Sequence, residues 1–128
     1  MRRRLQHGCA YVVCATASMY GFCAAAEDQF RMLDGKQIRT HVVGQDITNG
    51  PHWSMYVRPD GALIGEESGS SWTGRWKIQN DRLCITLPSS TSAECNEVWM
   101  SGTLVRMRAS KDQETFDAIV MAHRAKKQ

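Results

Sequence analysis

The strongest constraint on the fold is a regular alternation of residue types between residues 72 and 79. Apolar residues or glycine occupy every second position, and polar residues occupy the positions between them. Side chains of a β-strand point alternately to its two faces, so this pattern predicts a strand with one face on a core and the other in water. The residues on the predicted inner face are Trp72, Gly74, Trp76 and Ile78.

The same alternation recurs in short segments separated by turn-forming residues. Turns are expected over residues 58–61, 80–82 and 101–102, which are rich in Gly, Pro, Asn and Asp. About seven short strands joined by such turns predict a mainly β fold, a small antiparallel meander that forms a barrel or a sandwich. The remaining strands are expected at residues 53–57, 62–67, 83–87, 94–100, 103–109 and 115–123.

One short helical region is expected in front of the strands, over residues 27–44. Asp34 is a suitable N-cap, and Gly44 is a natural C-terminal stop. The apolar residues whose spacing allows them to share one face are Leu33, Ile38 and Val42.

Residues 1–26 have the composition of a secretory signal peptide. A basic head precedes an apolar stretch over residues 9–22, and small residues follow over 23–26. We expect cleavage after Ala26 or after Ala25, which gives a periplasmic or secreted product. A buried N-terminal helix is the alternative interpretation of this segment.

The formal net charge of +3 lies within the expected signal peptide. Without Arg2, Arg3 and Arg4, the chain has 13 basic and 13 acidic residues. A neutral chain has no electrostatic footprint for nucleic acid, and no stretch reaches the roughly 18 apolar residues of a membrane span. We therefore expect residues 27–128 to form a single β-rich domain, monomeric, with no nucleic-acid partner and no membrane span.

Two of the five cysteines, Cys84 and Cys95, remain after the expected cleavage. Two cysteines in an oxidising compartment most simply form one disulfide. If they face each other on neighbouring strands, the loop between those strands spans residues 88–91, an ordinary hairpin length. The bond would be structural; a reactive thiol is the alternative.

No residue pattern typical of a catalytic or metal site is present. His41, His52 and His123 are scattered along the sequence, and no glycine-rich phosphate loop opens a helix. Glu66 and Glu67 are adjacent on a predicted strand, so their side chains point to opposite faces. We expect no catalytic residues, no cofactor and no metal.

The four tryptophans are the remaining candidates for a binding role. Trp53, Trp72 and Trp76 fall on predicted inner faces, where they either fill the core or line an apolar pocket. Trp99 shares a predicted face with Cys95, so it is exposed or packs on the disulfide. An exposed tryptophan there is a candidate contact for a protein partner.

Several of these residues occur in an order that resembles small exported proteins of alphaproteobacteria, in families of unknown function. In those proteins a Gly-x-Trp strand precedes a Leu-Cys strand and a second Cys. The resemblance spans residues 33–105 and implies a periplasmic or secreted protein of lipocalin-like or barrel-like build, without catalytic residues to transfer. The residues that carry it are Trp53, Tyr56, Pro59, Asp60, Gly61, Gly74, Trp76, Asp81, Leu83, Cys84, Cys95 and Gly102.

Two further comparisons bear on function. The Gly74-x-Trp76 pair is similar to the Gly-x-Trp of lipocalins, where it lies in the first strand rather than a central one. Small bacterial barrel inhibitors of secreted proteases share the size, the export and the single disulfide.

The sequence thus favours a non-enzymatic exported barrel that binds a small apolar ligand or an envelope protein. Trp53, Trp72 and Trp76 would line the site. The alternative is an inhibitor of a secreted or periplasmic hydrolase, acting through an exposed loop or through residues 27–33.

Overall fold

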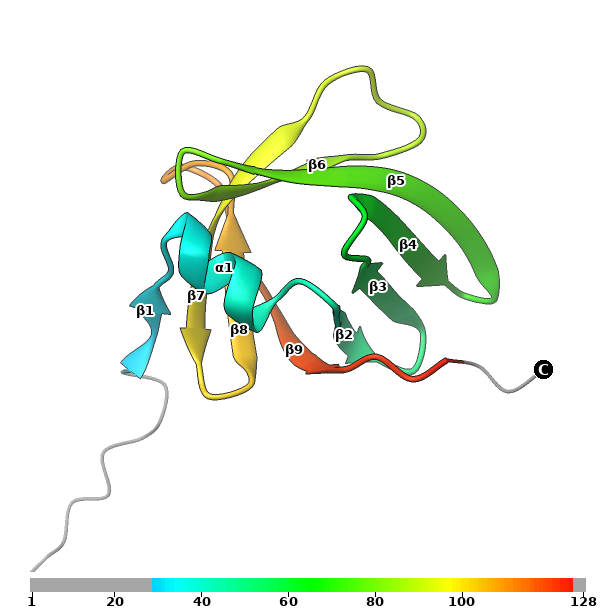
Figure 1. Ribbon diagram of the computed structural model, residues 1–128, viewed down its shortest axis with the longest axis horizontal. Helices are drawn as coiled ribbons and strands as arrows, with labels where there is room; N and C mark the ends of the chain where they lie inside the picture. The colour runs from blue at the N-terminus through cyan, green and yellow to red at the C-terminus, as the bar shows by residue number, and fades with distance from the viewer. Residues whose placement is uncertain (1–28, 126–128) are drawn as a thin grey trace, which may run out of the picture.

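Residues 29–125 form a closed antiparallel β-barrel with one short helix (Figure 1). The computed structural model describes residues 29–125, so the expected signal peptide over residues 1–26 lies outside the described residues. Eight consecutive strands each pair with the next, and the last pairs with the first to close the ring. The predicted fold class, a mainly β antiparallel meander forming a barrel or a sandwich, is confirmed, and of the two forms the structure has the barrel.

The barrel strands follow one another in chain order. Strand β9 pairs with β2, which completes the closed ring. A ninth strand, β1 (Arg31–Met32), pairs with residues 99–100 of β7, beyond the part of β7 that pairs with β6. The bounds are β2 (Gln45–Gly50), β3 (Trp53–Val57), β4 (Ala62–Glu67), β5 (Ser70–Gln79), β6 (Arg82–Thr86), β7 (Glu94–Ser101), β8 (Leu104–Arg108) and β9 (Phe116–Ala122).

All seven predicted strands are present, and two strands were missed. Strand β2 was missed because its sequence lacks an apolar alternation, with Ile47 its only buried residue. The connection between β6 and β7 spans residues 87–93, longer than the predicted loop over 88–91, because pairing stops at Ile85 and Glu94.

The helix is shorter than predicted. Helix α1 (Gly35–His41) covers only part of the expected helical region over residues 27–44. Two of the preceding residues form strand β1, which pairs with β7. The predicted N-cap is confirmed. Asp34 Oδ1 accepts a hydrogen bond from the Gln37 amide at 2.8 Å, and Gln37 Oε1 accepts one from the Asp34 amide at 3.0 Å.

Helix α1 closes one end of the barrel. Its buried Ile38 and the adjoining Val42 have no exposed surface and join the core. The amide of Gly35 donates to Asp81 Oδ1 at 2.8 Å, which ties the helix to the turn between β5 and β6. That turn has positive φ at Asn80 and Asp81, a conformation that Asn and Asp tolerate well.

Inward-pointing side chains from the strands fill the barrel beneath the helix. Trp76 belongs to this part of the core: it is 8% exposed, and its Nε1 donates to the carbonyl of Arg58 at 2.8 Å. The fully buried strand residues are Ile47, Val57, Leu63, Leu83, Cys84, Val98 and Val105.

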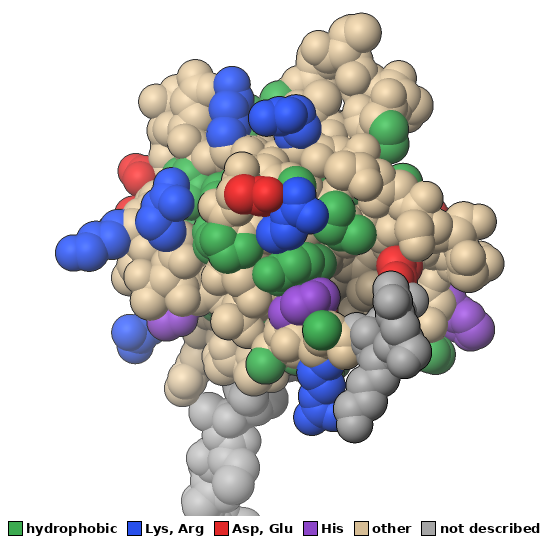
Figure 2. Space-filling model, turned by 45° about the vertical axis from the view of Figure 1, so that its right-hand side comes forward, with side chains coloured by type: hydrophobic (Ala, Val, Ile, Leu, Met, Phe, Trp, Pro, Cys, Tyr) green, Lys and Arg blue, Asp and Glu red, His purple; other side chains and the backbone are tan. Residues whose placement is uncertain are grey.

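Charged side chains on the outer surface form ion pairs between neighbouring strands. Arg106 binds Asp117 on the neighbouring strand through two hydrogen bonds of 2.8 Å, and Arg108 binds Glu97 at 3.0 Å. On the face shown in Figure 2, hydrophobic side chains gather near the centre and lysine and arginine side chains flank them. Within residues 29–125, no helix has both the length and the apolar character to cross a membrane.

Candidate ligand cavity at the open end of the barrel

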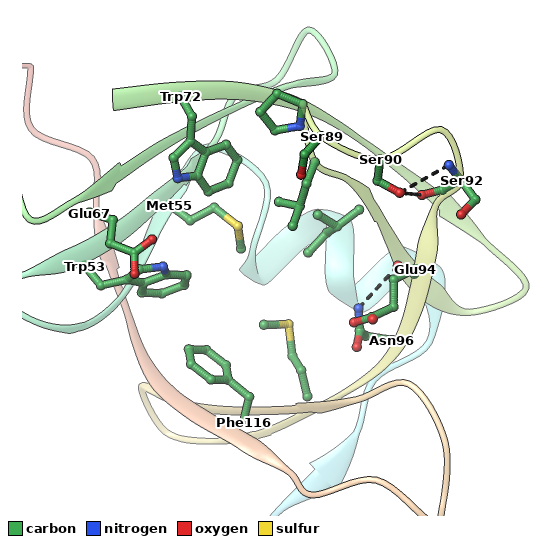
Figure 3. Close-up of a pocket in the computed structure, with 14 residues that line it drawn as sticks. Trp53, Met55, Glu67, Trp72, Ser89, Ser90, Ser92, Glu94, Asn96 and Phe116 are labelled. Carbon is green, nitrogen blue, oxygen red and sulfur yellow. Dashed lines mark hydrogen bonds between the residues drawn. The ribbon is translucent and has the colours of Figure 1, made fainter. Parts of the chain in front are cut away.

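The end of the barrel away from α1 holds a cavity of about 570 Å³ (Figure 3). Cavities that bind small molecules typically measure roughly 300–1,000 Å³. In Figure 3 the helix lies behind this opening, so one end of the barrel is covered and the other is accessible. The lining residues are Trp53, Met55, Glu67, Trp72, Ile85, Leu87, Pro88, Ser89, Ser90, Ser92, Glu94, Asn96, Met107 and Phe116.

Three aromatic and two methionine side chains are the largest apolar groups in the wall. The rings of Trp53 and Phe116 meet edge to face, with centroids 5.2 Å apart and planes at 68°. This geometry is the favourable one for aromatic pairs. Met55 and Met107 contribute flexible thioether side chains that adapt to the shape of a bound molecule.

Trp72 is seated against two glycines. Gly65 is its direct partner across the β4–β5 pair, and a Cβ at Gly65 would overlap the indole ring. A Cβ at Gly74 would stand 3.3 Å from Cζ3 of the same ring and 2.5 Å from the carbonyl oxygen of Thr86. The indole therefore lies flat against the barrel wall because both neighbouring positions lack side chains.

Six polar side chains interrupt the apolar wall: Glu67, Glu94, Asn96 and the three serines Ser89, Ser90 and Ser92. Asn96 is 7% exposed and is the one buried polar residue of the described chain. Its Nδ2 donates to the carbonyl of Glu94 at 3.3 Å. Figure 3 shows Glu67 next to Trp53, and Glu94 and Asn96 together on the opposite side of the cavity. These groups could orient a bound molecule that carries a polar end.

The disulfide braces one side of the opening. Cys84 and Cys95 are direct partners in the β6–β7 register, as predicted, and their Sγ atoms lie at disulfide-bonding distance. The bond links the two strands just before the loop over residues 87–93, which supplies Leu87, Pro88 and three serines to the cavity wall. It therefore supports the rim of the cavity.

The three tryptophans predicted to line one site lie in two different parts of the barrel. Trp53 and Trp72 lie in the cavity wall, whereas Trp76 does not line it. Trp76 is four residues further along β5 toward α1, about 13 Å away at ~3.3 Å per strand residue, so it lies in the covered part of the core. The assignment of Trp76 to the site is corrected on this geometry.

Trp99 lies on the outer face of β7, as its alternation with buried Val98 predicts. It is half-buried, and the guanidinium of Arg108 stands 5.9 Å from its ring centroid. Its role as a partner contact stays a prediction.

Sequence reasoning missed most of the cavity wall. Four of the lining residues occupy inward positions of predicted strands, so the alternation predicts that their side chains point into the barrel. They are Met55, Ile85, Met107 and Phe116. The sequence does not predict whether these residues lie in the open cavity or in the covered core, because that depends on which end of the barrel the helix covers. Glu67 was interpreted as part of a solvated edge; it is exposed, and it also lines the cavity.

A second polar cluster lies on the outer surface at the end of β9. His123 Nδ1 is 2.9 Å from Asp46 Oδ1, and the His123 ring stacks on Tyr56 with centroids 3.6 Å apart. These contacts hold the chain beyond β9 against β2 and β3. Within residues 29–125, no three His, Cys, Asp or Glu side chains lie together in an arrangement that could hold a metal ion.

No protein-family model, curated protein or solved structure matches the chain. The site therefore rests on its own geometry.

Proposed function

We propose that this protein is a non-enzymatic, exported binding protein that holds a small apolar ligand inside its barrel. The single observation that carries the proposal is the accessible cavity of about 570 Å³ with an aromatic and methionine-rich wall. Burial of a ligand's apolar surface is favoured by roughly 25 cal/mol for each Å² removed from water. A cavity of this size and lining therefore supplies the driving force for binding a small apolar molecule.

The expected export and the disulfide support a site of action in the periplasm or outside the cell. Disulfides such as Cys84–Cys95 persist in oxidising compartments and are rare in reducing ones.

Inhibition of a hydrolase by an inserted N-terminal arm is less well supported. Arg31 and Met32 are paired with β7, and Leu33 is 7% exposed within the core. Residues 31–33 of the segment over residues 27–33 are thus part of the folded barrel. Its deletion would remove core contacts, so it would not separate inhibition from folding.

The test is a fluorescence titration with N-phenyl-1-naphthylamine, a neutral probe that brightens in apolar surroundings. We expect saturable binding that weakens at least about fivefold in Trp72→Ala, because an aromatic wall contact is lost. Trp99→Ala is the matched control, since Trp99 is also half-buried but lies outside the cavity. Absence of saturable binding, or equal weakening in both variants, would overturn the proposal.

A further inference from the structure

We infer that the cavity selects ligands that join an apolar body to a positively charged head, such as an aryl or alkyl ammonium. This inference rests on the proposed binding function and names its ligand class. It begins from the charges in the wall. Among the described residues that line the cavity, Glu67 and Glu94 are the charged ones, and no lysine or arginine is present.

The two carboxylates have no cationic partner within residues 29–125, whereas three carboxylates on the outer surface are each paired with an arginine. Asp60, Glu97 and Asp117 each form an ion pair with an arginine on the outer surface. Neither Glu67 nor Glu94 forms an ion pair with any residue of the described chain. Their negative charges are therefore available to a ligand.

The aromatic side chains reinforce the same preference. Trp53 is the direct cross-strand partner of Glu67, so the indole and the carboxylate lie side by side on the inner face. The ring of Phe116 abuts Trp53. The faces of aromatic rings attract organic cations through the ring quadrupole. A carboxylate beside the indole ring of Trp53 is thus a site for an ammonium group.

The arrangement also sets the orientation of the ligand. Glu67 is the last residue of β4 and Trp53 is the first of β3, so both lie at the mouth. Met55 and Met107 lie deeper and are 3% and 6% exposed. The charged head therefore sits at the mouth, where it keeps part of its hydration, and the apolar body enters the barrel. An anionic head in the same place would be repelled by the adjacent Glu67 carboxylate, and the Glu94 carboxylate lies across the cavity.

The experiment compares three ligands that share one naphthalene ring. Isothermal titration of the disulfide-bonded protein is performed with 2-naphthylmethylammonium, 2-naphthylmethanol and 2-naphthoate. We expect the cation to bind at least about tenfold more tightly than the anion, with the alcohol between them. The cation's advantage should shrink as salt increases, because exposed charges are screened.

Variants assign the preference to the carboxylates. Glu67→Gln should reduce the cation's advantage at least about threefold, and the double variant with Glu94→Gln should abolish it. Glu66→Gln is the matched control, because the side chain of Glu66 lies on the outer face of the same strand. It removes the same charge from the neighbouring residue and should leave the preference unchanged.

The outcomes distinguish a wrong ligand class from a wrong binding function. If the three ligands bind equally well, or if the double variant keeps the cation's advantage, the inferred ligand class is wrong and the cavity still binds apolar molecules. If none of the three ligands binds, the proposed function and the inference both fail.

Discussion

The indole of Trp72 lies against the backbone of Gly65, its partner across the β4–β5 pair, in a space that a single methyl group would fill. This contact shapes one wall of the cavity. It also makes the glycine and the tryptophan dependent on each other, because the ring can lie flat only where the partner strand has no side chain.

Replacement of Gly65 with Ala should displace the Trp72 ring and lower both stability and affinity for the neutral probe. The decisive measurement is a double-mutant cycle in urea denaturation. Gly65→Ala should destabilise the wild type by about 1–3 kcal/mol, the usual cost of overpacking. In a Trp72→Ala background the same substitution should cost much less, since the clash is gone. Additive effects would contradict the contact.

Replacement of Trp76 with Ala tests the division of the tryptophans between core and cavity. Trp76 is buried and donates a hydrogen bond to the carbonyl of Arg58, so we expect a loss of about 3–5 kcal/mol of stability. Trp72→Ala should cost less stability, because Trp72 is partly exposed, while it weakens ligand binding more. The measurements are thermal unfolding and probe titration of each folded variant. A larger loss of stability in Trp72→Ala, or a larger loss of affinity in Trp76→Ala, would contradict the assignment of Trp76 to the core and Trp72 to the cavity.

The disulfide should stabilise the fold and the rim together. Its two cysteines are 11 residues apart, and closing such a loop contributes about 3 kcal/mol in the chain-entropy estimate. Removal of the bond in Cys84→Ala/Cys95→Ala should lower the melting temperature. It should also weaken probe binding, because residues 87–92 form part of the cavity wall. If the variant is less stable but binds the probe with unchanged affinity, the disulfide does not support the cavity rim.

The closed barrel and the position of the disulfide were predictable from local patterns. Alternation over residues 72–79 fixed which side chains face inward, and the partner register of Cys84 and Cys95 followed from their positions on neighbouring strands. These features depend on residues close in sequence or on a single covalent bond.

The site was harder to predict because it depends on contacts between distant segments. Trp72 and Trp76 share one face of one strand, and the sequence does not distinguish them. Only the position of the helix distinguishes them, because Ile38 of α1 and the adjoining Val42 cover the end of the barrel that holds Trp76. The strand β1 was missed because it exists only through its pairing with β7.

Acid should weaken the barrel through Glu97. A hydrogen bond from Arg108 holds the pKa of this carboxyl below its ordinary value of 4.5. Because the folded pKa is lowered, the stabilisation is complete above pH 4.5 and is lost as pH falls through the folded value. Urea unfolding at neutral pH and at about pH 3 should show a smaller acid-induced loss for Glu97→Gln than for the wild type. An equal loss in both would contradict this role.

The most direct test of the binding site follows the four tryptophan indole N–H signals by NMR during titration with N-phenyl-1-naphthylamine. The account predicts that the signals of Trp53 and Trp72 shift, because both rings line the cavity. Those of Trp76, in the covered core, and Trp99, on the outer face, should stay in place. A shift confined to Trp76 or Trp99, or no shift at saturating probe, would contradict a ligand site at the open end of the barrel.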